Sequence, residues 1–187
     1  MFPIEPIFPE GFSYFPGFIN ELEEEDLCTA IAGIELHQFH FQGYEAKRKV
    51  ASFGYDYSFE KGSLIKGKDI PPVFSSLVEK LSAALSIAPE NLAELLVTEY
   101  PVGSVINWHR DAPPFDLIAG VSLLADCTFR LRPYDKAKQN RQSIISHTVE
   151  RRSMYVMKGP ARTDWQHSIA PVKNLRYSIT VRTLKAG

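Results

Sequence analysis

The chain has 187 residues, of which 44% are hydrophobic and 23% are charged, and its formal net charge is -1. This length and composition are typical of a single globular domain with its own core, which we expect to extend over residues 1–187. The near-neutral charge gives no overall electrostatic case for a nucleic-acid-binding protein, which is usually basic. No apolar run is long enough to cross a bilayer, so we expect no membrane partner.

The N-terminal segment and the cysteines indicate a cellular compartment. The first residues are rich in proline and acidic rather than basic, unlike a signal or transit peptide. Two cysteines, Cys28 and Cys127, lie far apart and lack the spacing of metal ligands. A reducing compartment is therefore expected. We predict an intracellular, cytoplasmic monomer, which in a eukaryote could also be nuclear.

Charge is unevenly distributed along the chain. Residues 21–26 are nearly all acidic, whereas nine Lys or Arg residues occur between Thr128 and Arg162, against only Asp135 and Glu150. This pattern is compatible with an anionic partner on one side of the molecule. An ordinary solvated charged surface explains it equally well.

Two helices are predicted in the N-terminal half. Asn20 is a suitable N-cap, and acidic residues followed by apolar residues at helical spacing lead from it to Gly33. Residues 71–87 form a second amphipathic pattern that begins with proline.

Between these helices, residues 48–59 have the pattern of a strand. Aromatic residues occupy alternate positions, which would place all of their rings on one face. These residues are Phe53, Tyr55, Tyr57 and Phe59.

Beyond Pro89 the pattern changes to short strands separated by turns. We predict about eight strands, near residues 95–100, 105–108, 120–124, 128–131, 143–149, 153–157, 167–169 and 176–184. Many short strands after two helices favour a mainly β fold with flanking helices (α+β). The expected architecture is a double-stranded β-helix, or jelly roll, over residues 89–187, with the two helices packed outside it.

The tripeptide His109-Arg110-Asp111 is the first candidate for chemistry. In a strand, a spacing of two directs both potential ligands to the same side. Two histidines and one carboxylate hold Fe(II) while leaving positions open for substrates, and His167 is the best third ligand. Alone, the tripeptide more often marks a surface ion pair, and the same three ligands could hold zinc in a hydrolase.

The C-terminal strand supplies a second candidate. Arg176 and Arg182 are six residues apart, so both guanidinium groups lie on one face of an otherwise apolar strand. Buried arginines require anions, and a dicarboxylate would supply two. The alternative is a pair of surface arginines that alternate with buried Tyr177, Ile179 and Val181.

Together these motifs resemble the AlkB family of Fe(II)- and 2-oxoglutarate-dependent dioxygenases, which are nucleic-acid dealkylases. The resemblance covers residues 95–184, and is weaker in the aromatic segment 53–57. Its motifs are Thr98-Glu99-Tyr100, His109-Arg110-Asp111, Trp165-Gln166-His167 and the strand from Arg176 to Arg182.

The resemblance implies an enzyme in which His109, Asp111 and His167 bind Fe(II). It also implies 2-oxoglutarate and O2 as co-substrates, which together with iron supply the oxidising power. In the reaction that the resemblance implies, an N-alkyl carbon is hydroxylated and then lost as an aldehyde.

The same resemblance implies a set of 2-oxoglutarate ligands. Arg176 would pair with the distal carboxylate, helped by Tyr100 and Ser178, and Arg182 would lie near the carboxylate that chelates iron. Many relatives have Asn at the positions of Thr98 and Ser178. Both replacements can still form hydrogen bonds.

Methylated bases in DNA or RNA are the substrates that the resemblance implies, and a base must leave its stack to reach the iron. Residues 1–88 would then carry the two helices and a substrate-covering lid. The candidate substrate contacts are Lys47, Arg48 and Lys49 for phosphate, and Tyr55 and Tyr57, with Phe53, for base stacking.

Several alternatives remain open from the sequence. Aromatic residues on one strand face most often build a core, and we expect Trp108 and Trp165 to be packing residues. The same iron site could oxidise a protein side chain, or the fold could serve as a non-enzymatic binding module.

Overall fold

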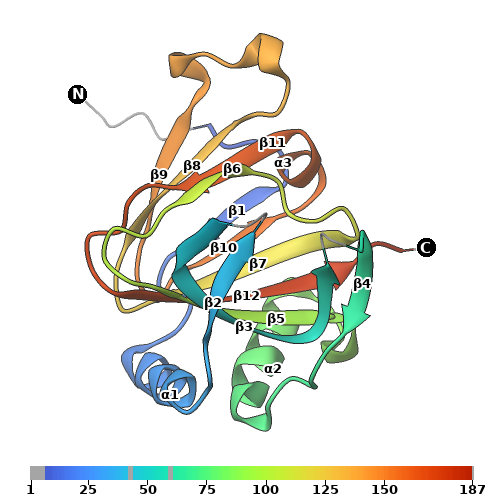
Figure 1. The fold of residues 1–187 in the computed structure, drawn as a ribbon, viewed down its shortest axis with the longest axis vertical. Coiled ribbons are helices and arrows are strands. Elements are labelled where there is room, and N and C mark those ends of the chain that lie inside the picture. Colours follow the sequence, from blue (N-terminus) through green and yellow to red (C-terminus); the bar gives the residue numbers. More distant parts are fainter. Residues whose placement is uncertain (1–6, 42–43, 59–60, 187) are drawn as a thin grey trace.

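The structure is a computed structural model that describes residues 7–41, 44–58 and 61–186. Two antiparallel sheets face each other, and helices α1 (Glu21–Ala32) and α2 (Ser75–Leu85) cover the outer face of the larger sheet (Figure 1). A short helix, α3 (Gly159–Thr163), leads into the smaller sheet. The predicted mainly β fold with two helices packed outside is confirmed.

Within the described residues the larger sheet has eight strands in the order β1-β10-β7-β12-β5-β3-β2, with β4 paired to β3. Its strands are β1 (Phe12–Phe15), β2 (His37–Phe41), β3 (Tyr44–Ser58), β4 (Ser63–Lys66), β5 (Glu94–Tyr100), β7 (Phe115–Leu123), β10 (Met154–Met157) and β12 (Arg176–Leu184). The smaller sheet has the order β6-β11-β8-β9. Its strands are β6 (Ile106–His109), β8 (Cys127–Pro133), β9 (Ile145–Val149) and β11 (Trp165–Ile169).

The predicted C-terminal strands correspond to β5 through β12, although β7 begins at Phe115 rather than near Gly120. The sequence did not predict β1, β2 or β4. Strands β1 and β2 lie at the two edges of the larger sheet, and β4 pairs only with β3. Such strands are defined by pairing with another segment, so their own residue pattern carries little signal.

Helix α1 begins as the sequence predicts. The Asn20 side chain accepts a hydrogen bond from the Glu23 amide, and the Glu23 carboxylate accepts one from the Asn20 amide, which completes a capping box. The helix ends before Gly33. Its buried residues include Leu27 and Ile31.

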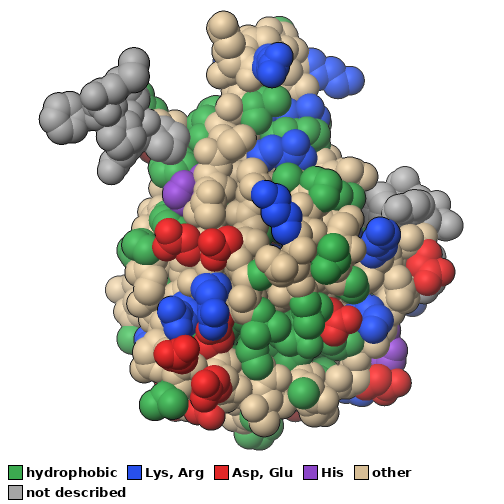
Figure 2. Space-filling model, turned by 90° about the vertical axis from the view of Figure 1, so that its left-hand side faces the viewer, with side chains coloured by type: hydrophobic (Ala, Val, Ile, Leu, Met, Phe, Trp, Pro, Cys, Tyr) green, Lys and Arg blue, Asp and Glu red, His purple; other side chains and the backbone are tan. Residues whose placement is uncertain are grey.

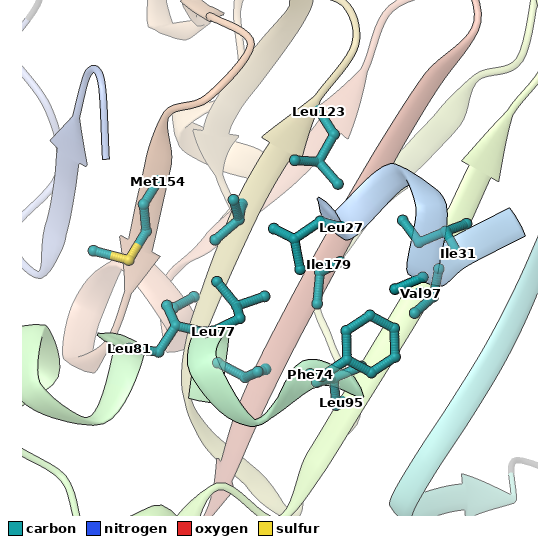
Figure 3. Packing of buried hydrophobic residues seen from close by; sticks show 14 of the residues in the cluster. Leu27, Ile31, Phe74, Leu77, Leu81, Leu95, Val97, Leu123, Met154 and Ile179 are labelled. Atoms are coloured by element: carbon teal, nitrogen blue, oxygen red, sulfur yellow. The ribbon is translucent and has the colours of Figure 1, made fainter. Parts of the chain in front are cut away.

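The helices and the larger sheet enclose the main core, shown in Figure 3. Phe74, directly before α2, and Leu81, in the middle of α2, are fully buried. They belong to one cluster with Leu95 of β5 and Ile179 of β12. A second buried hydrophobic cluster lies between the two sheets and includes Ile118 of β7 and Phe129 of β8. The inner face of β5 and β12 also carries buried polar residues.

Gly54 interrupts the regular alternation of β3. It has a positive φ of 82°, and a Cβ there would lie 2.2 Å from the backbone oxygen of Ala93. Both facts favour glycine, because other residues rarely adopt this conformation and would clash with the neighbouring strand. Beyond Gly54 the strand leaves β5 and pairs with β4.

The predicted single row of aromatic rings on β3 is therefore wrong. Phe53 is buried in the helix-covered core, with its ring centroid 6.4 Å from that of Phe74. Tyr55, beyond Gly54, is exposed. Phe59 lies outside the described residues.

Candidate metal centre and co-substrate pocket

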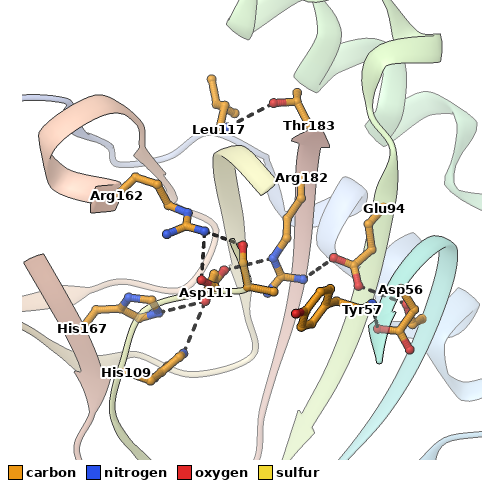
Figure 4. A network of polar contacts seen from close by, with 12 residues as sticks. Asp56, Tyr57, Glu94, His109, Asp111, Leu117, Arg162, His167, Arg182 and Thr183 are labelled. Atoms are coloured by element: carbon orange, nitrogen blue, oxygen red, sulfur yellow. Dashed lines mark hydrogen bonds and ion pairs between the residues drawn. The ribbon is translucent and has the colours of Figure 1, made fainter. Parts of the chain in front are cut away.

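Two neighbouring strands of the smaller sheet bring the predicted metal ligands together. His109 at the end of β6 pairs in register with His167 of β11. Oδ1 of Asp111, just beyond β6, lies 3.3 Å from Nε2 of His109 and 3.5 Å from Nε2 of His167 (Figure 4). The three potential ligand atoms all lie within 4.8 Å of one another, which is a geometry suited to one metal ion.

Neighbouring groups orient the two imidazoles. Nδ1 of His109 lies 2.8 Å from the backbone oxygen of Asn107, so a proton on Nδ1 leaves Nε2 free to bind a metal. The His167 ring stacks on Phe129, with the centroids 5.5 Å apart and the planes inclined by 12°. Burial lowers the pKa of His167 to about 3, with a further contribution from His109. His167 is therefore neutral, which is the form that coordinates metals.

Two arginines fix the third candidate ligand. Nε of Arg182 donates to Oδ2 of Asp111 at 3.0 Å, which leaves Oδ1 facing the histidines. Nη2 of Arg162 donates to the backbone oxygens of Asp111 and Ala112 at 2.9 and 2.6 Å. Burial alone would raise the pKa of Asp111, but Arg182 and the two histidines outweigh it and hold that pKa well below its usual range. Asp111 is therefore anionic.

Glu94 extends this network behind Arg182. Nη1 of Arg182 donates to Oε2 of Glu94, and Ser52 donates to the other oxygen of the same carboxylate at 3.1 Å. Burial raises the pKa of Glu94, and Arg182 opposes that effect. The charge of Arg182 is thus balanced by ion pairs with Asp111 and Glu94, and its contact with the chelating carboxylate of 2-oxoglutarate stays a prediction.

Arg176 is different, because one of its donors has no partner. It is 1% exposed, its Nε donates to Oγ of Ser122 at 3.0 Å, and its guanidinium lies 4.8 Å from the centre of the Tyr100 ring. Its Nη1 is buried and forms no hydrogen bond. A buried donor without a partner is costly, and a carboxylate would satisfy it.

The other predicted 2-oxoglutarate residues share this inner surface. Ser178 pairs in register with Thr98, and Arg176 pairs with Tyr100. The Ser178 hydroxyl lies 3.5 Å from the Tyr100 hydroxyl. All four are at least 90% buried, on the face of β5 and β12 that also carries Arg182.

Residue pattern alone did not identify four contributors to the site: Ser122, Arg162, Glu94 and Tyr155. Glu94 offered a signal, because it is charged and lies in phase with the inward-facing residues of β5. The others act through contacts that only the fold creates. Burial raises the pKa of Tyr155, so its hydroxyl stays protonated.

The predicted phosphate-binding triplet is divided between the two faces of β3. Nζ of Lys49 forms an ion pair with Glu99 at 3.2 Å, and Lys47 is exposed. Arg48 is partly buried, with its guanidinium 3.9 Å from the centre of the Phe39 ring. The three cations therefore do not form one patch.

The remaining predicted substrate residues lie in the β3–β4 hairpin. In the view of Figure 4, Tyr57 lies close to Arg182 and Glu94, at the edge of the network around the candidate ligands. Tyr55 is exposed on the same hairpin.

Among the described residues, no helix is both long and apolar enough to span a bilayer.

Comparisons with known proteins identify the family. A family model described as the 2OG-Fe(II) oxygenase superfamily matches residues 11–182. The mouse (Mus musculus) protein tRNA (carboxymethyluridine(34)-5-O)-methyltransferase ALKBH8 is 28% identical over 174 residues, which cover 88% of this chain. The chain spans only 25% of the length of that relative.

Solved structures share the fold. The structure of OsALKBH1 has a TM-score of 0.71 at 14% identity, covering 95% of this chain and 99% of that one. A Trichoplax adhaerens prolyl hydroxylase bound to a hypoxia inducible factor peptide has a TM-score of 0.64 at 14% identity, covering 93% and 83%. A Pseudomonas putida prolyl-4-hydroxylase has a TM-score of 0.59 at 15% identity, covering 95% and 94%.

At these identities the structures establish the jelly-roll fold alone. The superfamily match sets aside both the zinc hydrolase and the non-enzymatic binding module. The chain belongs to the 2OG-Fe(II) oxygenase superfamily, as an AlkB-like dioxygenase that uses Fe(II), 2-oxoglutarate and O2.

Proposed function

We propose that this dioxygenase removes alkyl groups from N-alkylated bases in DNA or RNA, with Fe(II) held by His109, Asp111 and His167. The observation that carries the proposal is the convergence of these three side chains, together with Arg176, a buried cation on the inner face of β12 whose Nη1 has no partner. The substrate class is supported by the AlkB-like sequence, including a relative whose name concerns tRNA.

The residues present fit both iron and 2-oxoglutarate. Two imidazoles and one carboxylate, whose Oδ1 faces them, form the donor set that Fe(II) oxygenases use. When bound, iron and 2-oxoglutarate supply the oxidising power for cleavage of an N-alkyl group. Arg176, assisted by Tyr100, Ser178 and Thr98, would hold the distal carboxylate of 2-oxoglutarate.

The protein contributes positioning and charge balance. Arg182 holds Asp111 by its side chain and Arg162 holds it by its backbone, which orients Oδ1 of the carboxylate toward the two histidines. Nε and Nη1 of Arg182 are already engaged. A contact of Arg182 with the chelating carboxylate of 2-oxoglutarate would therefore use Nη2.

The β2–β3–β4 region offers groups that suit an unstacked base. Tyr55 and Tyr57 supply flat rings in the β3–β4 hairpin, and Arg48 supplies a cation stacked on Phe39. Arg48 lies on β3 next to Lys49, which pairs with β5. We propose that Arg48, rather than the paired Lys49, contacts phosphate near the extruded base.

Oxidation of a protein side chain is the second candidate, and the prolyl hydroxylases of similar fold motivate it. A direct test incubates the enzyme with iron, ascorbate, 2-oxoglutarate and either methylated oligonucleotides, total tRNA or a peptide mixture. Mass spectrometry should detect demethylation of 1-methyladenine or 3-methylcytosine. Oxidised peptides with unchanged nucleic acid would contradict the proposed substrate class.

A further inference from the structure

The outer face of the smaller sheet carries an unusual group of cations. In β8 and β11, side chains alternate between the two faces: Phe129 and His167 point to the interior, whereas Arg130 and Arg132 point outward. This outer face lies on the opposite side of the sheet from the candidate metal ligands. The proposed site does not use it.

Two arginines on this face are stacked on one aromatic ring. The guanidinium carbons of Arg130 and Arg132 lie 5.1 and 4.5 Å from the centre of the Trp108 ring. Nε of each also donates to a neutral oxygen, in Ser168 at 3.0 Å and in Gln166 at 2.9 Å. Trp108, which was expected to be a packing residue, is partly exposed and packs against these two arginines.

A third stacked arginine extends this surface to the metal site. Arg110 lies between His109 and Asp111 in the chain, and its guanidinium lies 3.5 Å from the centre of the Tyr134 ring. Its Nη1 donates to the backbone oxygen of Thr163 at 2.7 Å. The cationic surface therefore begins beside the candidate metal ligands.

The surface continues along the segment that joins β8 to β9, which projects beyond the body of the molecule (Figure 1). This segment carries Lys136, Lys138 and Arg141, all exposed. We call the six cations together the arginine face: Arg110, Arg130, Arg132, Lys136, Lys138 and Arg141. In the view of Figure 2, Lys and Arg side chains gather over this projecting part, with no acidic side chain visible among them.

The charges of the arginine face are not balanced by ion pairs with other described residues. Among the ion pairs found in the described residues, none involves any of the six cations, whereas Lys49, Lys80 and Arg151 elsewhere pair with glutamates. Asp135 is in the same segment, but one of its carboxylate oxygens caps the amide of Ala137 at 2.9 Å. The face is therefore suited to an anion from outside the molecule.

The chemistry of these groups favours phosphate in a nucleic-acid backbone. Stacking and a neutral acceptor at Nε hold the guanidinium groups of Arg130 and Arg132 in place while leaving their terminal nitrogens for a ligand. Planar, weakly hydrated guanidinium groups bind phosphate through paired hydrogen bonds. A row of six cations matches a repeating anion better than a single acidic side chain.

We propose that the arginine face binds the phosphate backbone of the strand that flanks the base in the metal site. The proposal rests on the proposed nucleic-acid substrate and extends its contacts to the side of the molecule away from the β3–β4 hairpin. The salt slope is the slope of the logarithm of the binding constant against the logarithm of the salt concentration. For a single strand that contacts all six cations it should be about -4, since each contact contributes about -0.7.

The test measures fluorescence anisotropy of an unmodified single strand of about 16 nucleotides, in DNA and in RNA, at several salt concentrations. The first variant is Arg130→Gln with Arg132→Gln. The second is Lys136→Gln with Lys138→Gln, at exposed positions where loss of folding is not a concern. The matched control is Lys68→Gln with Lys185→Gln, which removes two exposed lysines after β4 and β12. Each face variant should reduce the salt slope by about 1.4, and the control should not change it.

Unchanged affinity and salt slope in both face variants would overturn the proposal, and so would absence of binding by the wild type at low salt. Poly-glutamate binding with the same affinity as the oligonucleotide would overturn it too, because the face would then recognise any polyanion. Oxidation of a methylated trinucleotide by the wild type separates this proposal from the proposed function. Turnover of the trinucleotide with unchanged strand binding in the variants refutes only the arginine face. Weakened strand binding without turnover of any methylated base refutes only the demethylase.

Discussion

Replacing Arg176 by methionine tests the proposed 2-oxoglutarate pocket, because methionine keeps most of the side-chain volume and removes the buried charge. The wild-type guanidinium has one buried donor, Nη1, without a hydrogen-bond partner. Hydrogen bonds to charged groups contribute about 1.5–3 kcal/mol. The affinity for 2-oxoglutarate should therefore fall by about 10- to 150-fold in Arg176→Met.

Isothermal titration of the Mn(II)-loaded protein, in which manganese is a redox-silent substitute for iron, gives this affinity directly. The comparison ligand is 2-oxobutyrate, which keeps the keto acid and lacks the distal carboxylate, so its affinity should not depend on Arg176. Arg176→Lys should recover only part of the lost affinity for 2-oxoglutarate, because the ammonium lacks the planar fork. Lys185→Met, at an exposed position, is the control.

Two results would refute the reasoning. Equal affinity for 2-oxoglutarate in the wild type and Arg176→Met would show that the distal carboxylate binds elsewhere. Equal losses for 2-oxoglutarate and 2-oxobutyrate would show that the substitution damages the pocket generally. Thermal unfolding of the ligand-free proteins distinguishes the second case, since replacing an incompletely satisfied buried cation by an apolar side chain should cost little stability.

Three further predictions concern the surroundings of the site and the core. Glu94→Gln removes one of the two carboxylates that hold Arg182, so the affinity for Mn(II) should fall by about 10-fold or more. An Mn(II) titration identical to that of the wild type would show that Glu94 does not position the metal ligands. Phe74→Ala should reduce the free energy of unfolding by about 3–5 kcal/mol in urea titrations, because Phe74 is fully buried; a loss under about 1 kcal/mol would contradict the packing described. Burial lowers the pKa of His147 below its usual 6.5, so as the pH falls the unfolded chain takes up a proton at this residue before the folded chain does. The free energy of unfolding of the wild type should therefore decrease as the pH drops below about 6.5. His147→Phe should weaken this pH dependence, and an identical pH profile in the variant would exclude the effect.

Residue pattern predicted the parts of the site that depend on local periodicity. A spacing of two placed His109 and Asp111 on one side, and the even spacing of Arg176 and Arg182 placed both on one face of β12. Helix α1 was predictable because its capping box is local in sequence. These features need no knowledge of which segments pair.

Features that depend on contacts between distant segments were not predictable. A glycine within a strand pattern is only a weak sign of an interruption, and the positive φ of Gly54 is known only from the structure, so the aromatic row was predicted to be continuous. Nothing in the sequence near Arg182 indicates that Glu94 already balances its charge. The sequence predicted that Trp108 packs, but its position on the outer face, against Arg130 and Arg132, follows from strand pairing that the sequence does not show.

Metal binding by the wild type and Asp111→Ala tests the central assignment most directly. Asp111 is the only anionic member of the proposed ligand set, and Arg182 keeps Glu94 as a partner when Asp111 is removed, so the fold should survive. Anaerobic titration with Mn(II) should show a single tight site in the wild type and its loss in Asp111→Ala, with an unchanged circular dichroism spectrum. Tight Mn(II) binding retained in Asp111→Ala would contradict the assignment of the metal centre to His109, Asp111 and His167.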